Sequence, residues 1–118
     1  MTPQPCARAI YWRAKPGQMD AYSAYLQHHV EPVDEEARRR GALRSFMTLV
    51  DPSPDAPWSH MRLFVFESHD ARSSMLTAPA AAAAAVTPDP AARAERAAYA
   101  ATLRDRVGEA DFDLLAPA

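Results

Sequence analysis

The fold of this 118-residue chain is decided by Trp58-Ser59-His60-Met61-Arg62-Leu63-Phe64-Val65-Phe66-Glu67. Aromatic and aliphatic residues of this kind favour strands, and the stretch is the strongest strand pattern in the sequence. Side chains alternate between the faces of a strand, so one face carries Met61, Leu63 and Val65, and the other carries Trp58, His60, Arg62, Phe64 and Phe66. Both faces are substantially apolar, and both should therefore be covered.

The segments on either side of this strand predict a mixed α and β chain. Strands are expected at residues 6–14, 43–50, 58–67 and 112–115, and helices at residues 18–40, from Ser68 to about Thr77, and from Asp89 to Val107, with the alanine run 80–85 continuing as helix. Gly41 and Gly108 are expected to end the two long helices. Pro32 lies inside the first of them, which predicts a kink near His28 and His29.

The predicted order of elements is β-α-β-β-α-β, which is the ferredoxin-like unit. We therefore expect an α+β fold in one domain spanning residues 1–118, with helices on one face of an antiparallel four-stranded sheet. The simplest cover for the other face is a second copy of the chain, packed sheet against sheet as a two-fold homodimer. We place Arg8, Ile10, Trp12, His60, Arg62, Phe64 and Phe66 on the helix side, and Met61, Leu63 and Val65 on the dimer face.

Composition and charge exclude several classes of function. The net charge is −2 without a massed basic segment, so nucleic-acid binding is not expected. Cys6 is the single cysteine, which fits a reducing compartment, and no secretory signal is visible, so a cytoplasmic location is expected. The alanine run is far shorter than the ~20 residues that span a bilayer. The four histidines lack metal-ligand spacing, and neither a metal nor another cofactor is expected.

The helical stretch around Tyr22 to Val33 carries the leading candidate for catalysis. Tyr22, Leu26 and Val30 fall on one apolar stripe, and His29 lies at its edge. Histidine titrates near neutral pH, so His29 is our candidate general base in a small-ligand pocket. The alternative is a packed or partly exposed histidine that bonds a backbone carbonyl.

The helix side of the sheet supplies the other candidate site residues. Arg62 and His60 share a face and could hold a substrate carboxylate, phenolate or enolate. Alternatively, Arg62 pairs with Glu67 or Glu31, and His60 caps the strand edge near the loop. The candidate substrate-binding residues are Trp12, Tyr22, Phe64 and Phe66, for which an aromatic core is the alternative explanation.

Two motifs and the order of elements resemble the dimeric α+β barrel superfamily, over about residues 7–115. Residues 25–33, YLQHHVEPV, are similar to the Y-x-x-x-H-x-P stretch of EthD-like barrels, with one extra residue between histidine and proline. Residues 64–71, FVFESHDA, are similar to the aromatic-E-S-x-x-A junction after the third strand. The superfamily also includes antibiotic-biosynthesis monooxygenases, haem-degrading monooxygenases and isomerases.

The resemblance implies a small-molecule enzyme. The haem-degrading branch needs an Asn, a Trp and a His at places that hold Ile10, Phe66 and about Leu76 here, so haem degradation is not expected. The oxygenases that form quinones use no metal or flavin, and Trp12, Arg62 and His29 could serve their chemistry. We expect cofactor-independent oxygenation, cyclisation or isomerisation of a small, planar, oxygen-rich metabolite such as a polyketide, quinol or lactone. The alternatives are a non-catalytic barrel that binds a ligand or a partner protein, and a sugar mutarotase.

Overall fold

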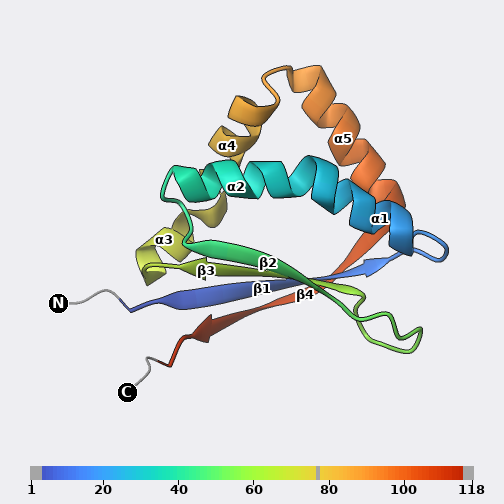
Figure 1. The fold of residues 1–118 in the computed structure, drawn as a ribbon, viewed down its shortest axis with the longest axis horizontal. Helices are drawn as coiled ribbons and strands as arrows, with labels where there is room; N and C mark the ends of the chain where they lie inside the picture. The colour runs from blue at the N-terminus through green and yellow to red at the C-terminus, as the bar shows by residue number, and fades with distance from the viewer. Residues whose placement is uncertain (1–3, 77, 116–118) are drawn as a thin grey trace.

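The computed structural model describes residues 4–76 and 78–115 and shows the helices gathered on one side of a four-stranded sheet (Figure 1). The elements in chain order are β1 (Cys6–Ala14), α1 (Met19–Tyr25), a π-helical turn (Leu26–Val30), α2 (Glu31–Arg39), β2 (Ser45–Val50), β3 (His60–Phe66), α3 (His69–Ser73), a 3₁₀ turn (Ser74–Leu76), α4 (Ala78–Val86), α5 (Pro90–Leu103) and β4 (Arg104–Asp113). None of the described helices is long and apolar enough to cross a membrane.

The sheet has the strand order β2-β3-β1-β4, and every neighbouring pair is antiparallel. Helical connections join β1 to β2 and β3 to β4, so the ferredoxin-like α+β fold predicted from the sequence is confirmed. The strands lie close to their predicted positions, except for β4. The expected end of the helix after Ser68, at Thr77, lies outside the described residues.

The alternation along β3 separates the two faces of the sheet as predicted. His60, Arg62, Phe64 and Phe66 are buried beneath the helices, and Met61, Leu63 and Val65 between them are half-buried on the other face. Pairing of Arg8 with Phe64 and of Trp12 with His60 puts these β1 residues on the helix side as well. The assignment of faces from sequence parity is therefore confirmed.

The core between sheet and helices is divided into two buried clusters. One consists of Cys6, Ala37, Leu43, Phe64, Phe66 and Ala82, and the other of Ala14, Tyr22, Tyr25, Leu26, Ala100 and Leu103. Each fully buried Phe or Leu side chain stabilises the fold by about 1.5–3 kcal/mol. Two separate clusters, rather than one continuous core, leave room for the cavities described below.

The long helix predicted for residues 18–40 is interrupted where the kink was expected. The π-helical turn Leu26–Val30 separates α1 from α2, and Pro32 lies in the first turn of α2, where its missing N–H costs little. Gly41 follows the end of α2 with a φ of 79°, a left-handed conformation that glycine adopts without strain. The predicted end of the helical segment is therefore confirmed.

The end of α5 differs from the prediction. The helix begins as expected, because the Asp89 side chain accepts a hydrogen bond from the Ala91 N–H and Pro90 occupies the first turn. However, it ends at Leu103 rather than at Val107, and β4 runs from Arg104 to Asp113 rather than over residues 112–115. Pairing along the whole length of β1 satisfies the backbone of this segment better than a further turn of helix would.

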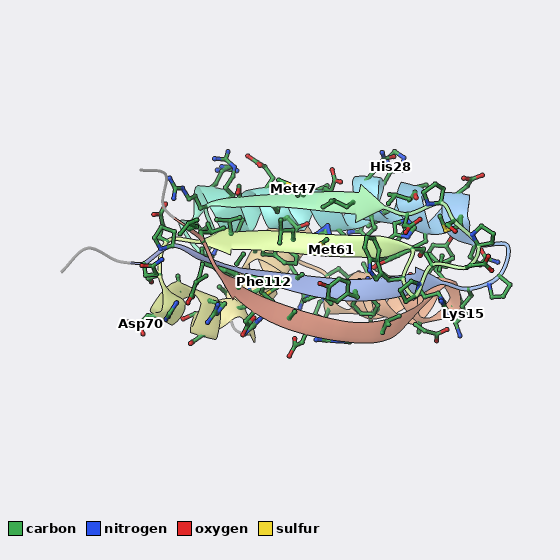
Figure 2. All side chains as sticks on the ribbon, turned by 90° about the horizontal axis from the view of Figure 1, so that it is seen from below. Lys15, His28, Met47, Met61, Asp70 and Phe112 are labelled. Carbon is green, nitrogen blue, oxygen red and sulfur yellow. The ribbon has the colours of Figure 1, made fainter. Side chains whose placement is uncertain are left out.

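The other face of the sheet has no helix over it, as Figure 2 shows with Met47, Met61 and Phe112 labelled. Met47, Leu49 and Phe112 are 40–49% exposed there. The register places Ala9 between Leu63 of β3 and Ala110 of β4. We call this apolar surface of the described chain the open sheet face.

Candidate functional site

In the described part of the chain, a large space between the helices and the sheet lies between the π-helical turn, α5 and β4. This outer cavity has a volume of about 590 Å³. Trp12 of β1 and His29 of the π-helical turn form part of its wall, together with residues of α1, α2, α4, α5 and β4. Its arginines are Arg93, Arg96, Arg104 and Arg106. Arg106 is exposed, so the cavity reaches the protein surface. Its volume falls within the roughly 300–1,000 Å³ of small-ligand sites.

A second, inner cavity of about 200 Å³ lies against the first. The two share Trp12, Val30, Val33 and Arg104 in their walls. The rest of the inner wall is mainly apolar and includes Ile10, Ala37, Leu43, Phe64, Phe66 and Met75. The helix side of the sheet therefore carries two adjoining spaces of different polarity.

His29 lies in the wall of the outer cavity, half-buried. Its ring packs against Tyr25, with 5.6 Å between ring centroids. Among the described residues, no side chain or carbonyl is hydrogen-bonded to the His29 imidazole, whereas His28 beside it is exposed. The alternative expectation, a histidine bonded to a backbone carbonyl, does not hold within the described chain. Both ring nitrogens of His29 are available to a ligand.

Arg104 lies at the boundary of the two cavities and was not foreseen as a site residue. Its guanidinium carbon is 3.7 Å from the centroid of the Trp12 ring, and its Nη1 donates to the Tyr22 hydroxyl at 3.1 Å. Within the described residues, no carboxylate lies within 4 Å of it. Stacking and the tyrosine thus hold a cation whose charge is not neutralised by an ion pair.

Tyr22, a predicted substrate-binding residue, lies behind Arg104 instead of in a cavity wall. The side chain is completely buried, and burial raises the pKa of its hydroxyl, so the phenol stays protonated. Tyr22 lines none of the described cavities, which corrects the prediction. Its contact with Arg104 gives it a positioning role.

Arg62 lies in the wall of the inner cavity and is 3% exposed. It forms a buried ion pair with Asp34 of α2, and its Nη1 donates to Thr48 Oγ1 at 3.2 Å. The expected partners Glu67 and Glu31 are both wrong. Burial raises the pKa of Asp34 to about 6, against the opposing effect of Arg62. Because this cation is committed to Asp34, we withdraw its predicted role in oxyanion stabilisation.

His60 is buried away from the cavities, which corrects its predicted catalytic role. One ring nitrogen is hydrogen-bonded to Ser23 Oγ and the other to Ser59 Oγ, both at 2.8 Å. Its ring meets the edge of Tyr22 at a centroid distance of 4.5 Å. Burial lowers the pKa of His60, which favours the neutral ring. With both nitrogens satisfied, His60 is a structural residue, and it does not cap the strand edge as the alternative had it.

The remaining aromatic residues predicted to bind substrate lie in the walls of the two cavities. Trp12 lines both, whereas Phe64 and Phe66 line only the inner cavity. Both phenylalanines also belong to the buried core, as the alternative explanation expected, and their role in substrate binding stays a prediction. In the described part of the chain, no three His, Cys, Asp or Glu side chains come together as a metal site requires.

Comparison with known proteins finds solved structures that resemble the structure of this chain. No protein-family model and no curated protein matches the chain. A Chloroflexus aurantiacus protein assigned to the antibiotic biosynthesis monooxygenases is 16% identical, with a TM-score of 0.55 over 97% of this chain and 96% of that one. SnoaB, a cofactor-independent oxygenase from Streptomyces nogalater, is 12% identical, with a TM-score of 0.53 over 97% and 96%.

A dimeric protein of unknown function with a ferredoxin-like fold, from Bacteroides fragilis, has a TM-score of 0.60 at 8% identity, over 97% of this chain and all of that one. The chain has the ferredoxin-like fold of these proteins. The resemblance inferred from sequence is thereby confirmed at the level of the fold. At these identities the likeness is one of fold alone.

Proposed function

We propose that the chain is a small-molecule enzyme in which His29 removes a proton from a planar, oxygen-rich metabolite bound in the outer cavity. The observation that carries this proposal is an imidazole without a hydrogen-bond partner among the described residues, in the same cavity wall as the cation of Arg104. A base without a partner is free to accept a substrate proton. A cation nearby stabilises the anion that remains.

In the proposed step, a carbon or oxygen acid gives its proton to a ring nitrogen of His29. The electron pair stays on the substrate as an enolate or phenolate, whose oxygen faces the Arg104 guanidinium. Trp12 lies beneath Arg104 and offers its ring to the planar substrate. Tyr22 holds Arg104 in place through the hydrogen bond to its hydroxyl.

Three outcomes are open to such an anion. Return of the proton at another carbon is an isomerisation, and attack on a carbonyl of the same molecule is a cyclisation. With molecular oxygen as second substrate, a methylene becomes a carbonyl and the second oxygen atom leaves as water, so no external reductant is needed. The likeness in fold to a cofactor-independent oxygenase supports the third outcome. The apolar inner wall disfavours the sugar mutarotase.

The proposal extends to the assembly. We infer a homodimer formed through the open sheet face, because this face exposes large apolar side chains and a protein of the same fold is dimeric. In this arrangement the two outer cavities stay on the outer, helical sides of the dimer.

The test measures proton transfer directly. The probe is 1,8-dihydroxyanthrone, whose acidic methylene exchanges its protons in D₂O at a rate that NMR follows. We expect the protein to accelerate exchange, and His29→Gln to remove about 10²–10⁴-fold of that acceleration. His28→Gln, on the neighbouring exposed residue, is the matched control and should keep the wild-type rate.

The alternative, a non-catalytic ligand-binding barrel, predicts that anthrone binds without accelerated exchange. Equal rates for His29→Gln and wild type would exclude His29 as the base.

A further inference from the structure

The outer cavity carries more positive charge than its own acidic groups balance. Four arginines and one aspartate line it. Asp105 pairs with Lys15 at 3.4 Å, and Arg106 pairs with Glu109 at 2.7 Å. Arg93, Arg96 and Arg104 have no carboxylate within 4 Å among the described residues. Three guanidinium charges therefore face this space without an ion-pair partner in the described chain.

Arg93 and Arg96 are held in place by neutral oxygens at the end of α4. Arg93 Nη1 donates to the carbonyl oxygens of Thr87 and Pro88 at 2.7 and 3.0 Å. Arg96 Nη1 donates to Thr87 Oγ1 at 2.5 Å. A guanidinium has five N–H donors in a fixed fork, so most of its donors stay free for a ligand.

The two arginines stand three residues apart on α5, where like charges repel by about 0.2–0.5 kcal/mol. Within the described chain, no carboxylate lies within 4 Å of either guanidinium to offset this repulsion. An anionic ligand bound between the two guanidinium groups would turn the repulsion into attraction. Planar, bidentate recognition by arginine suits a carboxylate above all.

The inner cavity suits an apolar group instead of an anion. Its wall is apolar, and its buried Arg62 and Asp34 satisfy each other. Its volume of about 200 Å³ suits a ring system more than a whole ligand. Since Trp12, Val30, Val33 and Arg104 line both cavities, one ligand can extend from one into the other.

We propose that the substrate is an aromatic carboxylic acid, with its rings against Trp12 and in the inner cavity, and its carboxylate bound by Arg93 and Arg96. The inference rests on the proposed function in taking the two cavities as one substrate site, and it names the class of substrate. Arg93 and Arg96 are then specificity-determining residues, separate from the base His29 and from the cation of Arg104.

The test is isothermal titration calorimetry with three probes: 2-naphthoate, its neutral isostere 2-naphthamide, and acetate as the anion without rings. We expect 2-naphthoate to bind at least tenfold more tightly than 2-naphthamide, a difference of about 1.4 kcal/mol, and acetate not to bind measurably. The double variant Arg93→Gln/Arg96→Gln should lose at least tenfold in affinity for 2-naphthoate and leave 2-naphthamide unchanged.

Two further variants separate charge from fold. Arg96→Lys retains the charge without the fork and should recover part of the affinity that Arg96→Gln loses. Arg38→Gln removes an exposed arginine of α2 that pairs with Glu35, away from both cavities, and should bind both naphthalene probes as the wild type does. Equal affinity for the two naphthalene probes, equal loss of both in the double variant, or no measurable binding of 2-naphthoate would overturn the inference.

The calorimetry and the proton-exchange measurement test the two proposals separately. Selective binding of 2-naphthoate without accelerated exchange of the anthrone would contradict the proposed function alone. Accelerated exchange without that selectivity would contradict the assignment of an acid substrate alone.

Discussion

Asp34 and Arg62 form a buried ion pair in which burial and the partner's charge act in opposite directions on the pKa of Asp34. Arg62 on β3 favours the charged form of Asp34, while burial and the neighbouring Glu31 on α2 disfavour it. The net effect raises the pKa of Asp34 from 3.8 to about 6. At such a carboxyl group the native protein holds its proton more tightly than the unfolded chain does.

This raised pKa predicts how stability depends on pH. The stability that the protonated form contributes is present below pH 3.8 and is lost as the pH rises to about 6. The free energy of unfolding of the wild type, relative to Asp34→Asn, should therefore fall by about 3 kcal/mol from a pH well below 3.8 to a pH well above 6. Urea denaturation of both proteins at several pH values measures the difference.

The difference in free energy of unfolding between the wild type and Asp34→Asn excludes the contributions of other titratable groups. Burial lowers the pKa of His60, so the contribution of His60 to the free energy of unfolding falls as the pH falls below 6.5. This dependence on pH is opposite to that of Asp34, and it is the same in both proteins. A difference that stays constant would show that burial and Arg62 balance at Asp34, and one that rises with pH would show that Arg62 outweighs burial; either outcome would contradict the raised pKa.

Single residues also show where inference from sequence stops. Parity placed His60 and Arg62 correctly on the helix side. Parity gave no information on how deeply the two side chains are buried or on their partners from other elements. His60 is hydrogen-bonded to Ser23 and Arg62 is paired with Asp34, both distant in sequence. His29 was found because its helical position faces the space between helix and sheet, which depends on local geometry alone.

At the scale of elements, a bulge in β4 decides which residues reach the outer cavity. Tyr11 pairs with Gly108 but Trp12 pairs with Arg106, so Val107 is an extra residue without a partner on β1. Beyond the bulge the alternation of side chains is reversed. Arg104 and Arg106 consequently share the helix side with Trp12, where regular pairing would turn them to the open sheet face.

The sequence could not easily reveal this arrangement. Residues 104–107 continue the helical pattern of α5, and Gly108 was interpreted as a helix end. In the structure Gly108 lies in β4 beside the bulge, a position where glycine within a strand is common. Arg104 was missed for this reason, because a residue assigned to a helix end was not considered for the sheet. This error did not change the predicted fold, because pairing with β1 overrides the weak helical preference of residues 104–107.

Insertion of an alanine between Arg106 and Val107 tests the role of the bulge. With the inserted residue opposite Trp12, Arg104 and Arg106 should turn to the open sheet face, and the stacking of Arg104 on Trp12 should be lost. We expect affinity for 2-naphthoate to fall at least tenfold, measured by calorimetry, with a changed near-ultraviolet circular dichroism signal from Trp12. Val107→Thr keeps the residue count and is the matched control.

Arg104→Gln should weaken binding in the same direction without any change of register, so the effect can be separated from a loss of folding. A folded insertion variant that binds 2-naphthoate as tightly as the wild type would show that the alternation of side chains set by the bulge does not control the cavity.

At the scale of the whole molecule, the helices cover one face of the sheet and leave the other bare (Figures 1 and 2). Met47, Leu49 and Phe112 on the open sheet face are each at least 40% exposed. Apolar side chains gathered on one face mark a contact surface in most proteins. A second copy of the chain, related by a two-fold axis, would bury the same residues on both partners.

The homodimer predicts the effect of a charge on this face. Leu63 lies on β3 between Ala9 and Met47, and it is half-buried in the single chain. Leu63→Arg should cost the single chain little, because its side chain can reach solvent there, but a buried, unpaired cation in the dimer should disrupt association. Light scattering coupled to size exclusion should report twice the chain mass of 13.0 kDa for the wild type and 13.0 kDa for the variant.

Val86→Arg is the matched control, because Val86 on α4 is also a partly exposed apolar residue but belongs to the helical side. It should remain dimeric. Because the cavities lie on that same helical side, the Leu63→Arg monomer should still bind 2-naphthoate. A wild-type protein that runs as a monomer at micromolar concentration, or a Leu63→Arg variant that stays dimeric, would mean that the open sheet face is not the interface.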